Sequence, residues 1–432
     1  MKFLCGASKQ DITPPIGTAL FGYRPDVFST SVHDPLDVTA VAFSDGVKTN
    51  ILISATVCEI RNDISESLRD SAAEAAGLER KDIILAATHT HCAPNVAGMD
   101  GWGEVDFGYI ESILRPAVAR AAKEAAENLC EAEMGVEDGE SLVGINRRQL
   151  NRNDRISLGQ NPWGAFDPVM TVMAIRRADN KKGIVNIVHY GCHGTACGCA
   201  HEITRDWSGM MLDRMEKLTG TISTYINGAE GDVGPRLTNG LTVGDISYVE
   251  ELGSQAASDA MRIYNKIKTY SVPETTAYHG KVTLPYKPMP ELDAVKKELS
   301  GYTEPEKLIN VQKLWYGHLK EVQEYLESGR TDMPEGYIID QTIIRVGDIV
   351  FIPFPFEIFS EISIRLRQYS GIRHTLSLAC SNGTNGYLPV QSELCRGGYE
   401  VDVFRCAGLF NMVDNADWYT VNDNLRIIES GV

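Results

Sequence analysis

Hydrophobic and polar positions in the first ninety residues follow two different periods. Segments 38–43 and 51–57 are rich in β-branched residues and flank the turn Ser44-Asp45-Gly46, so paired strands are predicted there. Segment 64–76 has the apolar spacing of an amphipathic helix. The run 83–86 is short, apolar and continuous, which predicts a buried strand.

The rest of the chain shows both periods in no regular order. Further helices are predicted over 109–129, 207–218, 246–270, 304–327 and 356–369. Further strands are predicted over 134–136, 170–176, 184–190, 223–226, 277–286, 337–353 and 376–380, with strand and turn character after 389. This alternation predicts an α/β fold with mixed β-sheets covered by helices. We see no linker or internal repeat, so we expect one large domain over residues 1–432. The order of predicted strands and helices does not give eight regular strand–helix units, which disfavours an amidohydrolase-like barrel.

Composition and charge narrow the classes of partner. Of the 432 residues, 43% are hydrophobic and 23% charged, as in a globular protein, and the net charge of -17 disfavours nucleic acid or an anionic membrane as partner. No window is apolar enough for a membrane span, and the first six residues are too short in apolar character for a signal peptide. Ten cysteines without an export signal indicate reduced thiols, so we expect a cytoplasmic protein. The oligomeric state is not predictable from these features.

The predicted strand at 83–86 leads into Thr88-His89-Thr90-His91. Residues two apart on extended backbone point to the same side, so His89 and His91 are expected to face one spot. Two neutral imidazoles at one spot indicate a metal centre such as zinc. The stretch alone leaves open whether both histidines are ligands.

Other candidates for the site are scattered along the chain. His193 follows the strand predicted at 184–190 and is flanked by glycines, so it is a second candidate ligand, whereas His189 is expected in the core. The spacing of Cys192, Cys197 and Cys199 matches no common zinc knuckle, which favours small buried thiols.

Carboxylate and phenol candidates come later in the chain. Glu357 follows Pro355 at the predicted start of a helix, where it either complements the helix dipole or serves as an oxygen ligand. Tyr387 and Tyr399 each follow a glycine turn in a polar stretch. Asp232 is expected to orient a histidine or cap a turn, and Asp206 to cap the helix at 207–218.

Nine short motifs follow one another along the chain. They are Asp11-Ile12-Thr13-Pro14-Pro15, Phe21-Gly22-Tyr23, His33-Asp34-Pro35-Leu36, Thr88-His89-Thr90-His91, Ile145-Asn146-Arg147, His193, Gly231-Asp232-Val233, Pro355-Phe356-Glu357, and Asn385-Gly386-Tyr387 with Tyr399 beyond it. In this order they resemble the N-terminal catalytic domain of the neutral/alkaline ceramidase family, which has Pro-Gly-Glu where this chain has Pro355-Phe356-Glu357.

The resemblance implies a zinc-dependent hydrolase that cleaves the amide bond of a small-molecule N-acyl substrate with metal-activated water. It implies one Zn²⁺ held by four side chains, those of His89, His193, Glu357 and Tyr387. It also implies that His91, Arg147 and Tyr399 face the substrate. The family pattern does not identify the proton acceptor, for which His91 is our candidate.

The chain departs from the family pattern in two respects. Gly234 stands where the family has a serine, which excludes a serine nucleophile at that position. The family's signal sequence and C-terminal immunoglobulin-like domain have no counterpart here, so we expect the catalytic domain alone. These departures leave two alternatives to a ceramidase-like activity. One is the same zinc chemistry on a small polar N-acyl or ester substrate, and the other is a catalytically silent metal-binding protein.

Overall fold

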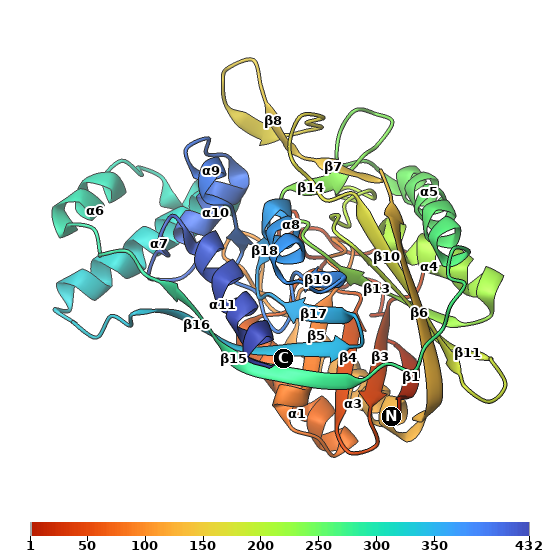
Figure 1. Ribbon diagram of the computed structural model, residues 1–432. Helices are drawn as coiled ribbons and strands as arrows, with labels where there is room; N and C mark the ends of the chain where they lie inside the picture. The colour runs from red at the N-terminus through yellow and green to blue at the C-terminus, as the bar shows by residue number, and fades with distance from the viewer. Residues whose placement is uncertain (1, 432) are drawn as a thin grey trace.

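Two mixed β-sheets form the centre of the molecule in the computed structural model, which describes residues 2–431 (Figure 1). The strands of the larger sheet are, in spatial order, β13 (Ile222–Asn227), β11 (Gly183–Tyr190), β10 (Val169–Arg177), β6 (Cys130–Glu140), β1 (Leu4–Asp11), β3 (Asp37–Ser44), β4 (Thr49–Ala55) and β5 (Ile83–Ala87). Two edge pairs, β11/β13 and β4/β5, are parallel, and the pairs between them are antiparallel.

The smaller sheet packs face to face on the larger one. Its strands are β15 (Thr275–Pro285), β16 (Gly336–Val346), β17 (Ile349–Pro353) and β19 (His374–Leu378), of which only β17 and β19 pair in parallel. Branched and aromatic side chains from both sheets share one buried cluster, which includes Phe43, Ile187, Ile344 and Phe351. Because both faces of each sheet are covered, many strands have continuous apolar sequences.

Helices cover the outer faces of both sheets. The larger sheet is covered by α1 (Asn62–Ala76) and α3 (Arg115–Glu127) over β1, β3 and β4, and by α4 (Asp206–Thr219) and α5 (Ile246–Tyr264) over β10, β11 and β13. The smaller sheet is covered by α8 (Ser360–Tyr369) and α11 (Ala416–Ser430), and α10 (Tyr399–Cys406) packs against α7 (Asn310–Glu327) and β20 (Tyr387–Leu388). The α/β class with mixed sheets covered by helices is therefore confirmed.

The remaining elements are short or peripheral. A helical stretch leading into α3 comprises α2 (Phe107–Tyr109) and a π-helical turn (Ile110–Leu114). Away from the sheets lie α6 (Leu292–Leu299) and α7 (Asn310–Glu327), and α9 (Gln391–Leu394) precedes α10 (Figure 1). Two-stranded pairs are β2 (Ser31–Val32) with β12 (Glu202–Ile203), β7 (Gly144–Asn146) with β14 (Val233–Pro235), β8 (Arg148–Leu150) with β9 (Ile156–Leu158), and β18 (Glu357–Ile358) with β20 (Tyr387–Leu388). Short 3₁₀ turns lie at Arg80–Asp82 and Pro305–Lys307. No helix within residues 2–431 is both long and apolar enough to cross a membrane.

The larger sheet curls until its two ends meet. The hydroxyl of Ser54 on β4 donates to the carbonyl of Tyr225 on β13 at 2.6 Å, although the two strands lie near opposite ends of the strand order. Beyond the strand ends, Thr90 and Gly194 form a parallel bridge. The loops that follow β5 and β11 therefore lie side by side, which is a tertiary relationship that no local pattern encodes.

Several sequence expectations about local structure are wrong, among them that the helix predicted over 246–270 continues beyond Tyr264. The segment after residue 389 is mainly helical, with α9, α10 and α11, because α11 buries one apolar face against the smaller sheet. The helix predicted from 356 begins at Ser360, since Glu357 is drawn into β18 by pairing with β20. The helix predicted over 304–327 begins only at Asn310.

Candidate metal and catalytic site

The candidate site residues come from loops at the carboxyl ends of the parallel strand pairs. His89 follows β5, His193 follows β11 and Glu357 follows β17. Tyr387 follows β19, and Glu59 follows β4. Ligands of α/β proteins commonly bind outside the carboxyl ends of strands, because the loops there converge around one crevice.

Three buried ligand atoms meet at one point in this crevice. Oε2 of Glu357 lies 3.0 Å from Nε2 of His193 and 3.3 Å from Nε2 of His89. The three side chains form one group whose ligand atoms all lie within 4.8 Å of one another. All three residues are at most 4% exposed. The structure thus brings together three of the four residues predicted to hold a metal.

Both histidines present a bare nitrogen lone pair to this point. Nδ1 of His193 donates to the carbonyls of Glu230 and Val233, at 2.9 and 3.0 Å. Nδ1 of His89 donates to the carbonyl of Cys58 at 3.0 Å. A carbonyl only accepts, so each Nδ1 carries the proton and each Nε2 is left as an acceptor.

Electrostatics favour the metal-binding protonation state at His193 and Glu357 but oppose it at His89. Burial disfavours the charged form of His89, but Cys58, Cys380 and Glu357 outweigh burial and raise its pKa well above its usual value. Burial lowers the pKa of His193 to about 3, and the positive charge of Arg147 adds to the shift. Burial disfavours ionisation of Glu357, but the neighbouring imidazoles of His89 and His193 hold its pKa well below its usual value. A neutral imidazole and an ionised carboxylate are the metal-binding forms of these groups.

Tyr387 lies next to Glu357 through backbone pairing. The two residues are opposite each other in the parallel bridge of β18 and β20, and both line the same cavity. The Tyr387 hydroxyl accepts a hydrogen bond of 2.8 Å from Nη2 of Arg147. Burial raises the pKa of Tyr387 well above its usual value, and Arg147 opposes this shift. Its role as a fourth ligand remains a prediction.

His91 reaches the same point by a different backbone path from the one expected. The strand β5 ends at Ala87, and His89 has the left-handed φ of 64°, so the two histidines are not on extended chain. Their Nε2 atoms nevertheless lie 3.4 Å apart. Nδ1 of His91 is buried without a hydrogen-bond partner within residues 2–431. Burial lowers the pKa of His91 well below its usual value, and the neighbouring His89 adds to the shift.

Gly22 makes room for the His91 ring. Its φ is 132°, and a Cβ there would lie 2.4 Å from Nδ1 of His91. The Tyr23 ring packs edge-on against the same imidazole, with centroids 5.0 Å apart. The Phe21-Gly22-Tyr23 segment therefore positions His91.

Arg147 and Tyr399 meet the site in different ways. Arg147 is buried, donates to Glu400 and Tyr387, and is not among the residues that line the cavity. Glu400 is shared with Arg148, which donates to its other oxygen at 2.7 Å. Tyr399 lines the cavity at the first turn of α10, and its ring centroid lies 5.6 Å from that of Tyr387. Arg147 thus reaches the site through the Tyr387 hydroxyl.

Other sequence candidates are structural. His189 is buried and contacts the Ser377 carbonyl through Nε2 at 2.8 Å. The Asp232 carboxylate accepts from the backbone and hydroxyl of Ser360, so it caps α8, while backbone carbonyls of its loop orient His193. Gly234 pairs with Ile145, and a Cβ there would lie 2.7 Å from Thr242.

The three cysteines close to His193 in sequence, and Asp206, do not belong to the group formed by His89, His193 and Glu357. Cys192, Cys197 and Cys199 belong to none of the potential metal-binding groups within the described part of the chain. The Asp206 carboxylate accepts from the amides of Ala196, Cys197 and Trp207 and so secures the loop after His193.

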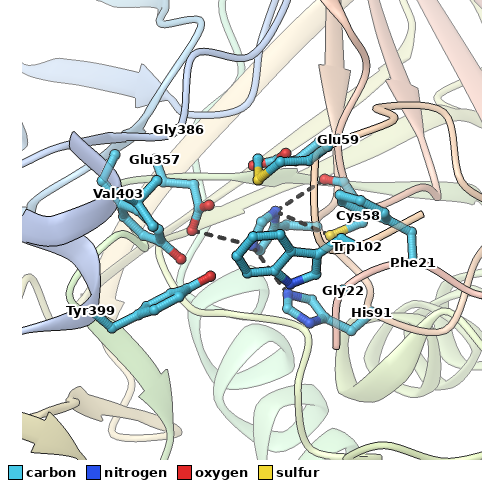
Figure 2. A pocket seen from close by; sticks show the side chains of 13 residues that line it. Phe21, Gly22, Cys58, Glu59, His91, Trp102, Glu357, Gly386, Tyr399 and Val403 are labelled. Atoms are coloured by element: carbon cyan, nitrogen blue, oxygen red, sulfur yellow. Dashed lines mark hydrogen bonds and ion pairs between the residues drawn. The ribbon is translucent and has the colours of Figure 1, made fainter. Parts of the chain in front are cut away.

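The cavity beside His89 and Glu357 has a volume of about 30 Å³. Figure 2 shows Glu357 and Tyr399 entering from one side and Cys58, Glu59 and His91 from the other, with Trp102 in the foreground. Its apolar wall is made by Phe21, Met99, Trp102 and Val403. Burial raises the pKa of Glu59 to about 8, and the carboxylate of Glu357 adds to the shift. Sequence reasoning missed Glu59 and Trp102; the one signal was an acidic residue within the otherwise apolar run after β4.

Comparisons with known proteins support the fold. The sequence matches no protein-family model and no curated protein. The structure is similar to the crystal structure of neutral ceramidase from Pseudomonas aeruginosa, with a TM-score of 0.75 and 18% identity over 100% of this chain and 75% of that one. It is also similar to a structure of ceramidase complexed with C2, with a TM-score of 0.71 and 16% identity over 99% of this chain and 74% of that one. The chain therefore has the neutral ceramidase fold.

Proposed function

We propose that this protein is a zinc-dependent hydrolase that cleaves an amide bond of an N-acyl substrate. The observation that supports this most strongly is the convergence of Nε2 of His89, Nε2 of His193 and Oε2 of Glu357. Three acceptor atoms at one buried point repel one another unless a cation lies among them. The fold, shared with two ceramidases, agrees with this interpretation.

The donor set fits Zn²⁺. Zinc takes imidazole nitrogen and carboxylate oxygen as ligands. Catalytic zinc sites commonly have three protein ligands and one position open to water or substrate, and some become five-coordinate. His89, His193 and Glu357 would hold the ion, and Tyr387 is the adjacent candidate for a fourth ligand. When bound, Zn²⁺ would polarise a carbonyl and lower the pKa of a water molecule from 15.7 toward ~7.

The chain's own side chains would then orient the substrate and move the proton. Nε2 of His91 lies 3.4 Å from Nε2 of His89, so His91 is placed to accept a proton there and pass it to the leaving nitrogen. Tyr399 lines the cavity with a hydroxyl that can donate to the oxyanion of the tetrahedral intermediate. Arg147 fixes the Tyr387 hydroxyl and adds positive charge behind it.

The shape of the cavity favours a compact substrate over a long-chain lipid amide. The cavity volume of about 30 Å³ is far below the ~300–1,000 Å³ of small-molecule pockets, so a substrate requires the cavity wall to move, and a long acyl chain requires more movement than a short one. Trp102 is only 4% exposed and packs with Phe21 and Cys58 at one side of the cavity. A small N-acyl or ester compound is therefore the second candidate substrate, beside ceramide.

A panel of N-acyl compounds with acyl chains from two to sixteen carbons tests the activity. Each compound is offered to the zinc-loaded protein, to the same protein treated with a chelator, and to chelated protein with zinc restored. We expect amine release that the chelator abolishes and zinc restores. Amine release that survives complete removal of metal would contradict the proposal, as would no release from any member of the panel.

A further inference from the structure

Glu59 is a buried acidic residue that faces the cavity with one oxygen, Oε2, that has no hydrogen-bond partner within residues 2–431. It lies four residues beyond the end of β4, is 3% exposed and lines the same cavity as His89, His91 and Glu357. Its Oε2 atom is fully buried and accepts no hydrogen bond within residues 2–431. A buried polar group without a hydrogen bond is costly, so a position that keeps one is a candidate for ligand contact.

The other buried carboxylates near this site accept hydrogen bonds from side chains of the protein. Glu400 accepts from both Arg147 and Arg148, at 2.8 and 2.7 Å. Glu230 accepts from the Cys380 thiol at 3.2 Å and does not line the cavity. Glu59 instead has the like charge of Glu357 as a neighbour. The hydroxyl of Thr384 also lies near Glu59, but Glu59 lacks the arginine partners that Glu400 has.

A second metal ion is a poorer explanation than a substrate group. Glu59, His89 and Cys380 do lie close enough together to form a potential metal-binding group. However, Nδ1 of His89 donates to the Cys58 carbonyl, and Nε2 faces Glu357 and His193. A cation beside Glu59 would thus lack the nitrogen ligand that completes the group.

We propose that Glu59 is a specificity-determining residue that accepts a hydrogen bond from a donor group of the substrate. This inference rests on the proposed hydrolase function and narrows its substrate class. The apolar wall of Phe21, Met99, Trp102 and Val403 contacts the remainder of the molecule. The substrate is accordingly a compact N-acyl compound that carries a hydroxyl or ammonium group near the scissile amide.

Three matched compounds test the proposal: a short N-acyl amino alcohol, the N-acyl alkylamine that lacks only the hydroxyl, and the N-acyl diamine. The variants are Glu59→Met, which removes the acceptor, and Glu59→Gln, which keeps one acceptor oxygen. Glu230→Gln is the matched control, because it alters a buried carboxylate that lies outside the cavity wall. Zinc content is measured for every variant.

We expect the wild type to prefer a donor-bearing compound to the alkylamine in kcat/KM by about 2- to 12-fold, the range for one hydrogen bond between neutral groups. Glu59→Met should abolish that preference and leave the alkylamine nearly unaffected. Glu59→Gln should restore it for the amino alcohol but not for the diamine, since an amide cannot pair with an ammonium charge. Glu230→Gln should change all three compounds by one common factor.

Binding to the chelator-treated protein separates this inference from the hydrolase proposal. Calorimetric titration with the same three compounds reports recognition without turnover. Tighter binding of a donor-bearing compound that Glu59→Met abolishes supports the inference even if no compound is cleaved. Equal affinity for all three compounds in the wild type overturns it, and so does a loss of zinc from Glu59→Gln, which would make Glu59 a metal ligand.

Discussion

Oε2 of Glu357 lies 3.0 Å from Nε2 of His193, and neither atom has a hydrogen-bond partner within the described residues. The Nδ1 proton of His193 is already donated to two backbone carbonyls, so the facing atoms are both acceptors. Two acceptors at this distance are stable only with a positive charge beside them. This relationship supports the proposed metal centre, and the proposal determines which variants should lose the metal and which only the activity.

Gly22→Ala should reduce activity without loss of zinc. The added Cβ would meet the His91 ring at 2.4 Å and displace it from the metal point. We expect a loss of about 10²–10³ in kcat, the scale seen when one positioned catalytic group is removed. Gly17→Ala is the matched control, because Gly17 also has positive φ but its Cβ would meet nothing within 4 Å. Equal losses in the two variants would show that backbone strain, and not His91, is responsible.

Arg147→Lys should impair the site through Tyr387. One ammonium group cannot reproduce the two directed bonds of the guanidinium to Glu400 and Tyr387. We expect kcat to fall by at least about tenfold, in proportion to one lost charge-assisted hydrogen bond. Arg61→Lys changes an exposed pair with Asp63 and should leave kcat unaltered. Full activity in Arg147→Lys would show that the bond to Tyr387 is irrelevant to the reaction.

Trp102→Ala should shift the preference toward longer acyl chains. Removing the indole enlarges the cavity at its apolar wall, so kcat/KM for long acyl compounds should rise relative to short ones. The same change should destabilise the fold by about 3–5 kcal/mol, the usual cost of truncating a buried aromatic residue. Trp102→Phe should give a smaller shift, and Trp163→Ala, at a side chain that is 93% exposed, none. An unchanged chain-length profile in Trp102→Ala would refute the limit placed on substrate size.

Asp206 should make stability depend on pH. Burial raises its pKa to about 6 in the folded protein, above its unfolded value, so the folded state binds the proton more tightly. The stability from this group is therefore complete below about pH 4 and is lost as the pH rises through about 6. Relative to Asp206→Asn, the wild type should lose about 2–3 kcal/mol between pH 4 and pH 7. Urea unfolding of both proteins measures this difference, and a pH-independent difference would exclude the shift.

Much of the fold follows from local pattern. The helix at α1 and its end at Gly77 are visible in the apolar spacing, because one amphipathic face covers the sheet. Local pattern gives the wrong structure for residues 391–406, because α9 and α10 are short and α10 begins directly after the glycine turn at Gly398. The local sequence pattern predicts Glu357 in a helix, because its pairing partner, Tyr387, is thirty residues away and has no influence on that pattern.

The site was predictable only in part for the same reason. His89, His193 and Glu357 could be named from motifs, but their convergence depends on the curling of the larger sheet and on the bridge of β18 to β20. Glu59 and Trp102 carry no motif. Their position on the cavity wall depends on packing between loops that are distant in sequence, with α7 behind Trp102.

Zinc stoichiometry of three histidine variants tests the central claim most directly. His89→Ala, His193→Ala and His91→Ala are purified in parallel, loaded with zinc and analysed for bound metal, with circular dichroism to confirm folding. The account predicts about one zinc per chain in the wild type and in His91→Ala, which should lose activity by about 10²–10³, and little zinc in the other two. Full zinc in folded His193→Ala, or loss of zinc from His91→Ala as complete as from His89→Ala, would contradict it.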